Sequence, residues 1–471
     1  MDGSSFLFAQ WLFLKLLALN YFFAFFSLAK QVKGLYCSKG IAPCQQLLAL
    51  IEDTHQTKLY WQVPTLFWIK CNDKTLQFAA YFGLVISILA LLGIFPSFFF
   101  FLLWIIYLSF FSVGTPFLNF QWDALLLEIG FIAIFFAIQS PAPLILILLL
   151  WFVLFRFMFS SGITKILYGS SEWSNLTAMD YHYETQPLPT KLAYYLHKLP
   201  KSLAKLSVLG VFFIEIIVPF FIFGPEQLRI TAFIFLIFFQ ILIILTGNYA
   251  FFNTLTITMC VVLLNDSYLS WLPVVPSLTS FGNPLNLFLS AVGIILIILN
   301  VLQLVSFFAP IGKLGNAILN FQSPFCLVNS YGLFVHMTTV RYEIIVEGSE
   351  DGETWLPYEF KWKPGELNKP PRQIAPYQPR LDWQMWFAAL SSARSNPWFV
   401  AFVIRLLEGS QDVLKLLKNN PFAQKPPKYI RALLYKYKFS NLKTKEQTGD
   451  WWIRELLGFY AHPIALDMVE K

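Results

Sequence analysis

The stretch PLILILLLWFVLFRFMFS, residues 143–160, is apolar almost throughout and contains one charged residue, Arg156. A run of roughly 17–25 mainly apolar residues is long enough to cross a bilayer as a helix, and a helix satisfies its own backbone groups where lipid offers no hydrogen bonds. The whole chain has the same bias, because 57% of its 471 residues are hydrophobic and only 13% are charged. Soluble domains contain about 25% charged residues. The sequence therefore predicts a polytopic α-helical membrane protein.

Further apolar runs extend this prediction to about eight or nine membrane spans. The runs at 97–113 and 249–264 are the shortest. The first run contains Lys15 and lacks a small-residue cleavage site, so we expect an anchor and not a cleaved signal peptide. The predicted spans are residues 6–29, 76–95, 97–113, 124–139, 143–160, 205–223, 229–246, 249–264 and 285–308.

Lysine residues concentrate in two predicted polar loops, 30–75 and 161–204. A count of nine spans places both loops and the C-terminal region on one side of the membrane, which an excess of lysine marks as cytoplasmic. The formal net charge is only +7, and no basic cluster with interleaved aromatic residues stands apart from the membrane flanks. We therefore expect the lipid bilayer, and no nucleic acid, as a partner.

The chain divides into three predicted parts. Residues 1–310 form the multi-pass membrane domain with the two polar loops. Residues 311–330 are rich in Gly, Pro and Asn, which is typical of a linker. From 331 to 471 the charge density rises and long apolar runs end, so this part is expected to be a soluble domain of ordinary size.

The soluble part is predicted to be α+β. The stretches RYEIIVEG (341–348) and TWLPYEFKWK (354–363) flank an Asp-Gly turn, which is a strong hairpin signal. Residues 379–392 and 397–409 have the pattern of two amphipathic helices, the second beginning at a proline and ending at a glycine. A proline-rich turn and a further strand are expected within residues 418–440.

Ionisable side chains inside membrane spans are costly and mark either function or helix pairing. Glu128 and Arg156 lie on consecutive predicted spans joined by the turn QSPAP (139–143). Each is about fourteen residues, or about 20 Å of helix, from that turn, so an antiparallel hairpin brings them to similar depth. Two interpretations stay open for this intramembrane pair: a structural ion pair, or a pair kept for function.

The stretch LTAMDYHYETQPLPT, residues 176–190, is polar although long apolar runs flank it. In an extended segment its alternating Asp180, His182 and Glu184 would project to one side, where they could exchange protons. The alternative is that the charges pair with lysines and the following prolines fix a loop that caps a cavity. The catalytic candidates of this neighbourhood are Arg156, Lys165, Asp180, His182 and Glu184.

No metal or cofactor is expected. The stretch 176–190 has no second His and no Cys beside His182. The five cysteines of the chain are scattered, and neither a Cys-x-x-Cys nor a His-x-x-x-His pattern of metal ligands occurs.

Eight long segments, in this order along the chain, resemble the lipase maturation factor family. They are QWDALLLEIGFIAIF (121–135), LFRFMFSSGITKI (154–166), LTAMDYHYETQPLPTKLAYYLHKLP (176–200), GNYAFFN (247–253), VEGSEDGETW (346–355), PRLDWQMWFAAL (379–390), NPFAQKPPKYIRALLYKYKF (420–439) and WWIRELLGFY (451–460). The resemblance implies a polytopic protein of the endoplasmic reticulum membrane in a eukaryote, or of the cell membrane in a bacterium. It implies help to secreted lipases in reaching their active, assembled form. It also implies a C-terminal domain in the lumen, which is the opposite side from the cytoplasmic one that the lysine count gives, and both alternatives stay open.

Two shorter resemblances concern parts of the chain. LFRFMFSSGITKILYGSSEW (154–173) is similar to a stretch in the membrane domain of the vitamin K-dependent carboxylase group, which implies shared fold ancestry. EGSEDGETW (347–355) resembles hairpins of discoidin-like β-sandwiches, which suggests a β-sandwich-like part in the C-terminal domain.

We predict a membrane-embedded maturation factor that assists the folding or assembly of an exported client, a lipase by resemblance, and not an enzyme. Trp383, Trp386 and Phe387 lie on one predicted helix; such a stripe is usually core, and the alternative is a face that contacts the client. Deleting residues 331–471 is then expected to leave an inserted membrane domain that no longer matures a client. The alternative function is an integral-membrane enzyme that acts on a lipid or polypeptide through the five catalytic candidates.

Overall fold

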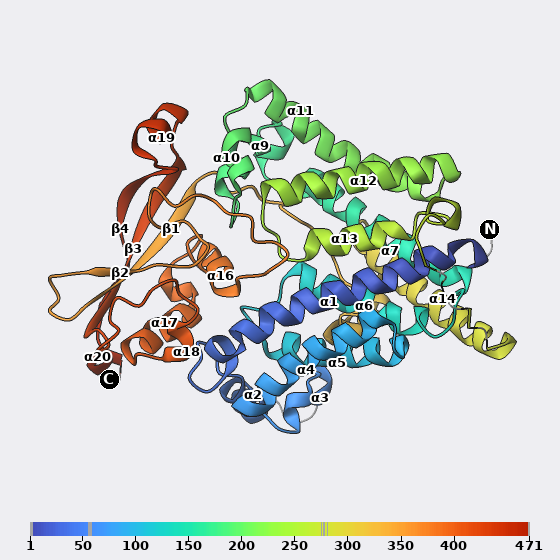
Figure 1. Ribbon diagram of the computed structural model, residues 1–471, viewed down its shortest axis with the longest axis horizontal. Helices are drawn as coiled ribbons and strands as arrows, with labels where there is room; N and C mark the ends of the chain where they lie inside the picture. The colour runs from blue at the N-terminus through green and yellow to red at the C-terminus, as the bar shows by residue number, and fades with distance from the viewer. Residues whose placement is uncertain (1–2, 55–58, 275, 277, 280, 470–471) are drawn as a thin grey trace.

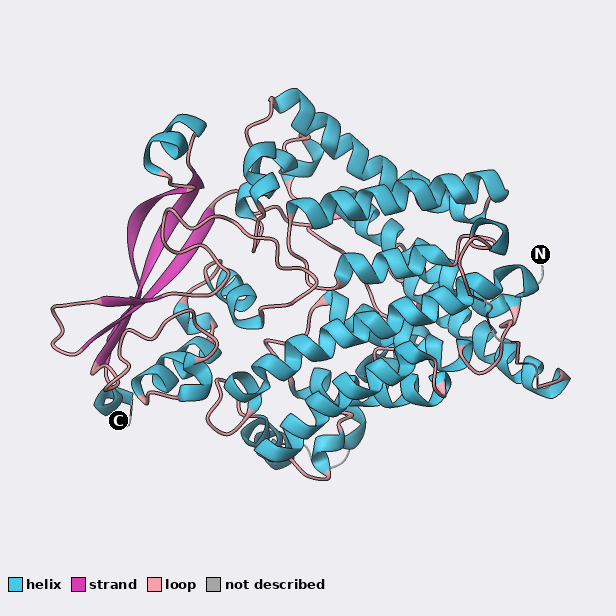
Figure 2. Ribbon diagram, viewed as in Figure 1, coloured by secondary structure: helices cyan, strands magenta, loops and turns pink. Residues whose placement is uncertain are grey.

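The computed structural model describes residues 3–54, 59–274, 276, 278–279 and 281–469. A bundle of long helices makes up most of the molecule, and a small β-sheet with its own helices covers one end of the bundle (Figures 1 and 2). The N-terminus lies at the opposite end of the bundle from this sheet. The predicted class, a polytopic helical membrane protein with a C-terminal α+β part, is confirmed.

Within the described residues, seven helical segments have the length and composition of membrane spans. One of them, Lys201–Phe223, is an α-helix, α11 (Lys201–Phe212), followed by a π-helical turn, η3 (Phe213–Ile217), and a 3₁₀ turn, η4 (Val218–Phe223). The other six are α1 (Leu7–Tyr36), α4 (Asp73–Leu92), α5 (Pro96–Val113), α7 (Leu144–Leu167), α12 (Glu226–Thr246) and α14 (Asn283–Val305).

The predicted spans 124–139 and 249–264 correspond to shorter helices. These are α6 (Gln121–Phe136), with 16 residues, and α13 (Phe252–Val261), with only 10. Most residues of both helices are buried against the other helices. A helix that is enclosed by protein does not have to match the thickness of the lipid, because neighbouring helices take the place of lipid around it.

The two polar loops contain short helices: α2 (Cys44–Thr54), α3 (Leu59–Gln62) and η2 (Leu66–Trp68) in the first, and α8 (Ser171–Ser174), α9 (Ala178–Thr185) and α10 (Lys191–Leu196) in the second. Residues 55–58 of the first loop lie outside the described residues. Both loops contact the C-terminal part: Arg405 donates to the carbonyl of Gly40 at 2.9 Å, and Phe439 donates its backbone N–H to Glu184 at 2.7 Å. The two loops and the C-terminal part therefore lie at one end of the bundle, as the nine-span count predicts.

Residues 311–330, predicted as a linker, contain a helix, α15 (Gly312–Gln322), and a 3₁₀ turn, η6 (Ser323–Phe325). The segment that follows returns to the bundle, where Asn329 and Tyr331 bind Glu128 of α6. This part of the chain thus contacts the first polar loop, where Trp61 donates to the carbonyl of Phe321, and the helix α6, where Asn329 donates to Glu128.

The C-terminal part contains one antiparallel sheet in the order β2-β1-β3-β4. The predicted hairpin is confirmed, with Val346 opposite Tyr358, and the predicted helices and third strand are also present. The predicted β-sandwich-like part is not present. The described residues hold no second sheet, and helices cover this one. Its elements are β1 (Arg341–Ser349), β2 (Leu356–Tyr358), α16 (Arg380–Ala388), α17 (Pro397–Leu407), α18 (Gln411–Leu414), β3 (Tyr429–Phe439), α19 (Leu442–Thr448), β4 (Trp452–Ile464) and α20 (Leu466–Val469).

Buried polar contacts fix this part on the bundle. Arg380 of α16 donates to the carbonyl of Phe117 at 2.8 Å and lies 3.4 Å from the carboxylate of Asp123 at the start of α6. Asn248, after α12, accepts from the backbone N–H groups of Ile374 and Ala375 at 2.6 and 2.9 Å. Because buried polar groups are costly to leave unpaired, these contacts hold the two parts in one arrangement.

Candidate functional site

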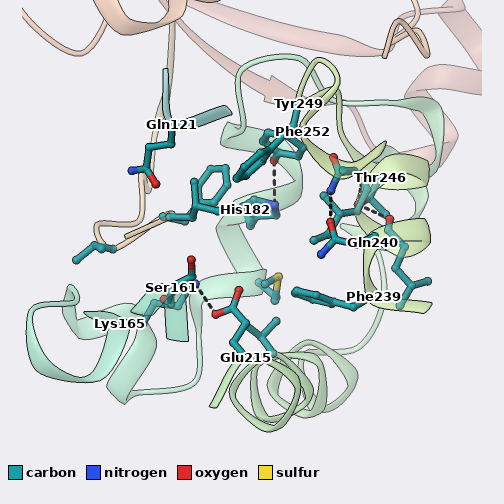
Figure 3. A pocket seen from close by; sticks show the side chains of 18 of the residues that line it. Gln121, Ser161, Lys165, His182, Glu215, Phe239, Gln240, Thr246, Tyr249 and Phe252 are labelled. Atoms are coloured by element: carbon teal, nitrogen blue, oxygen red, sulfur yellow. Dashed lines mark hydrogen bonds and ion pairs between the residues drawn. The ribbon is translucent and has the colours of Figure 1, made fainter. Parts of the chain in front are cut away.

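A cavity of about 810 Å³ lies where the membrane helices meet the C-terminal part. Its volume is within the range of small-molecule and cofactor pockets, which is about 300–1,000 Å³. The wall comes from α7, α9, η3, α12, α13, the segment 332–338 and α16. Most of the lining is aromatic or aliphatic, and the polar side chains form a few distinct groups (Figure 3).

The first polar group is an ion pair between Lys165 of α7 and Glu215 of η3, with 2.6 Å between Nζ and the carboxylate. The helices approach so closely here that a Cβ on Gly162 would lie 2.8 Å from the Cβ of Glu215. Only glycine therefore fits at this position. The π turn places Glu215 toward α7, and such turns are frequent at functional sites. Lys165 also contacts the face of the Trp173 ring, at 5.2 Å from its centroid.

His182 of α9 lies in the cavity wall, and its Nε2 is 3.3 Å from the hydroxyl of Tyr249. Tyr249 in turn donates to the side-chain oxygen of Gln186 at 2.7 Å. Burial, with a smaller contribution from the positive charge of Lys165, lowers the pKa of His182 to about 4. The imidazole is therefore neutral near pH 7 and contributes hydrogen bonding to the cavity without a charge.

The expectation that Asp180, His182 and Glu184 project to one side is wrong, because they lie on the helix α9 and not on an extended segment. Helical spacing separates His182 from the other two. Asp180 does not line the cavity. Glu184 faces the sheet, where it accepts from the N–H of Phe439 at 2.7 Å, and burial raises its pKa while that hydrogen bond opposes the shift. The structure therefore brings only His182 and Lys165, of the five candidates, to the cavity.

A third polar group joins α12 and α13. Asn253 donates to the side-chain oxygen of Gln240 at 2.8 Å, and both residues line the cavity. The side-chain oxygen of Asn253 and the ring N–H groups of Trp122 and Trp383 have no hydrogen-bond partner among the described residues. An unpaired buried donor or acceptor costs about 1–3 kcal/mol. The three atoms belong to residues that line the cavity, but each atom is itself buried within the wall.

Trp383, Trp386 and Phe387 of α16 form part of the same wall. Trp383 packs edge-on against Trp122 of α6 with 4.9 Å between ring centroids, and Trp386 donates to the carbonyl of Thr185 at 2.8 Å. Both tryptophans are buried, and only Phe387 is partly exposed. The structure therefore does not offer this stripe as an exposed face for a client, because the helix turns it toward the membrane domain.

Glu128 and Arg156 form a fully buried ion pair, as the hairpin geometry predicts, but they lie outside the cavity. Arg156 also donates to the side chain of Asn300 at 2.8 Å and to the carbonyl of Asn329. Glu128 accepts from the hydroxyl of Tyr331 at 2.7 Å and from the backbone N–H of Asn329 at 3.1 Å. All the polar atoms of the pair are thus satisfied within the protein, and this network joins α6, α7 and α14 to the start of the C-terminal part.

Sequence reasoning did not single out Tyr249, Gln240 or Asn253 as site residues. A signal was present for two of them: Gln240 and Asn253 are amides in apolar runs, and polar side chains within membrane helices face protein or a cavity. Tyr249 gave no signal by itself, since tyrosine is common at membrane boundaries. Within the described residues, no group of three His, Cys, Asp or Glu side chains could hold a metal ion. The arrangement can bind and orient a polar group at the inner end of an apolar space.

Comparison with known proteins gives matches over nearly the whole chain. The family model described as the lipase maturation factor transmembrane domain matches residues 8–271, and the lipase maturation factor C-terminal domain matches residues 327–462. No solved structure matches the chain.

Several curated proteins are similar to the chain. It is 35% identical to lipase maturation factor 2 of Xenopus laevis, over 95% of this chain and 81% of that protein. It is 34% identical to human lipase maturation factor 2, over 94% of this chain and 81% of that protein. It is 33% identical to human lipase maturation factor 1, over 96% of this chain and 87% of that protein. Both halves of the fold are thus matched in order, and this chain belongs to the lipase maturation factor family.

Proposed function

We propose that this chain assists the folding or assembly of a secreted lipase as a multi-pass membrane protein, located in the endoplasmic reticulum membrane if its source is a eukaryote. The observation that carries the proposal is the match, over more than nine-tenths of the chain, to proteins named lipase maturation factors. The alternative of an integral-membrane enzyme is not favoured, because these relatives are named for maturation and not for a reaction.

The C-terminal sheet supplies a better candidate for the client contact than the buried α16 stripe does. β4 is the longer of the two edge strands of the sheet, and four large apolar side chains on it are about half exposed: Ile453, Leu456, Leu457 and Phe459. An edge strand presents unpaired backbone groups to another extended segment, and an exposed apolar patch marks an interaction site. We propose that an extended, apolar segment of the unfinished lipase adds to this edge.

The function is tested in cells that lack their own lipase maturation factors and express a secreted lipase. Expression of this chain should raise the specific activity of the secreted lipase, that is, the activity per amount of lipase protein. An unchanged specific activity, with the chain present in the membrane at normal level, would contradict the proposed function.

The client contact is tested with Leu457→Asp on β4. Leu442→Asp on α19 is the matched control, because both leucines are 47% exposed and lie in the same part of the chain. We expect Leu457→Asp to lower lipase specific activity and co-purification with the lipase, while Leu442→Asp leaves both unchanged. Equal effects of the two variants would exclude the β4 edge as the contact and leave the maturation function itself standing.

A further inference from the structure

Part of the cavity lining lies on the exposed apolar surface of α12. Phe238 and Leu242 of α12 line the cavity and are also exposed, at 55% and 40%. Across from them, Gly210 of α11 lines the cavity, and a Cβ placed on it would meet no atom within 4 Å. The surrounding surface of α11 and α12 is formed by exposed aliphatic and aromatic side chains such as Leu206 and Ile234. One opening of the cavity therefore lies between α11 and α12; the lining residues Leu199, Phe387 and Leu390 are also exposed, on the side of the second polar loop and α16.

The inner end of the cavity is polar but carries no unpaired charge. Lys165 and Glu215 neutralise each other at 2.6 Å, and His182 hydrogen-bonds to Tyr249. Gln240 and Asn253, joined by a hydrogen bond of 2.8 Å, add uncharged amide groups to the same wall. An anionic headgroup would need an uncompensated cation here, and a cationic one an uncompensated carboxylate, because burying an unpaired charge is costly.

We propose that this cavity binds an uncharged lipid of the acylglycerol class, which enters from the bilayer between α11 and α12. The acyl chain lies along the apolar wall toward Phe238 and Gly210, and the hydroxyl or ester oxygens of the headgroup lie among the polar groups at the inner end. Hydroxyl groups both donate and accept, and this suits a wall that holds the imidazole of His182, the hydroxyl of Tyr249 and the amide of Gln240. This inference concerns binding alone, and it does not depend on the maturation of a lipase.

The test uses the full-length chain, purified in detergent and labelled with a photoactivatable monoacylglycerol. We expect labelling that excess unlabelled monoacylglycerol abolishes, with labelled peptides from α7, α11, α12 or α16. Labelling confined to the outer surface of the bundle, or unaffected by competition, would overturn the proposal.

Two variants narrow the mouth from opposite sides: Gly210→Trp on α11 and Leu242→Trp on α12. Each should lose the competed labelling while keeping the melting temperature of the unaltered protein. The matched controls are Gly210→Ala, which adds a methyl group to open space, and Leu206→Trp, which adds the same ring on α11 outside the cavity lining. Both controls should label like the unaltered chain. If the two tryptophan variants are folded and still label fully, the ligand does not occupy this cavity.

The headgroup assignment has its own test. Photoactivatable fatty acid and phosphatidylcholine probes, used at the same concentration, should label the cavity peptides less than the monoacylglycerol does. Stronger labelling by the fatty acid or by the phospholipid would overturn the assignment to an uncharged lipid. Capture of an extended apolar peptide in place of every lipid probe would show that the cavity belongs to the client site.

Discussion

Glu128 and Arg156 show how much a buried charge requires in this protein. The pair is completely buried, and each partner has further hydrogen bonds to Asn300, Asn329 or Tyr331. A buried pair by itself is weak evidence for stability, because desolvation offsets the Coulomb attraction. The added hydrogen bonds satisfy the remaining polar atoms, so that each charge depends on several segments of the chain at once.

Replacing either partner alone, as in Glu128→Leu or Arg156→Met, should destabilise the fold by about 3–5 kcal/mol because the other charge stays buried and unpaired. The double variant should recover only part of the lost protein level, since Asn300 and Tyr331 then lose their partners too. The amount of folded protein in detergent extracts measures both effects. If the amount of folded protein is unchanged in both single variants, the pair contributes little to stability.

His182 gives a second prediction at this scale, and it concerns pH. Its pKa is lowered to about 4 in the folded protein, against about 6.5 in the unfolded chain. The unfolded chain therefore binds more protons between these values, so stability falls as the pH drops from about 6.5 toward 4, with a limiting slope of about 1.4 kcal/mol per pH unit. Above about pH 6.5, His182 does not contribute to the change of folding stability with pH.

His182→Gln should therefore lose less stability than the unaltered chain when the pH falls from 7.5 to 5, as judged by melting temperature in detergent. His462→Gln, at an exposed position on β4, is the control and should behave like the unaltered chain. Glutamine keeps a hydrogen-bonding group for Tyr249, so we also expect His182→Gln to retain most lipase maturation. A stable but inactive His182→Gln variant would support proton chemistry at this residue.

Among the elements, the segment after α9 depends on a strand of the C-terminal sheet. Residues 186–190 are buried without being part of a helix or a long strand. The guanidinium of Arg341, on β1, donates to the carbonyls of Glu184, Gln186 and Pro187. A buried non-helical segment is tolerated only where other parts of the protein form hydrogen bonds to its backbone groups.

Arg341→Met should leave these carbonyls without donors, and each unsatisfied buried group lowers the free energy of unfolding by about 1–3 kcal/mol. We expect the second polar loop to become sensitive to limited proteolysis and the protein level to fall. Arg431→Met on the neighbouring strand is the control, because its ion pair with Glu347 is partly exposed and such pairs contribute about 0–1 kcal/mol. Equal protease resistance of both variants would show that the loop is held by its other contacts.

At the scale of the whole molecule, the two parts complete each other. Tyr331, Arg341 and Arg380 of the C-terminal part satisfy buried groups of the membrane part, and α16 closes one side of the cavity. The boundaries 1–310, 311–330 and 331–471 remain a prediction. Because these contacts cross the predicted boundaries, we infer that residues 1–310 do not fold independently of residues 331–471.

Deletion of residues 331–471 should therefore yield a membrane part that is degraded, and not the stable, inserted remnant that the sequence alone leads us to expect. The reason is that Asp123 loses Arg380 and the carbonyls of residues 184–187 lose Arg341. Deletion of residues 466–471, which follow β4, is the control and should leave the protein level unchanged. Recovery of a monodisperse membrane part in detergent after the long deletion would contradict this expectation.

What the sequence by itself determined was set by composition and by local pattern. Apolar runs predict membrane helices because lipid cannot hydrogen-bond to the backbone, and the Asp-Gly turn between β-patterned stretches predicts the hairpin of β1 and β2. The Glu128–Arg156 pair was also predictable, because a short turn and a fixed helical rise determine the depth of each residue.

Tertiary structure decided the rest. It made 178–185 a helix and turned Glu184 toward the sheet, and it buried Trp383 and Trp386 that could equally have formed a surface. It also gathered His182, Tyr249 and Asn253 around one cavity. Residues far apart in the chain meet only when helices pack, and which side of a short helix faces inward depends on the partner that covers it.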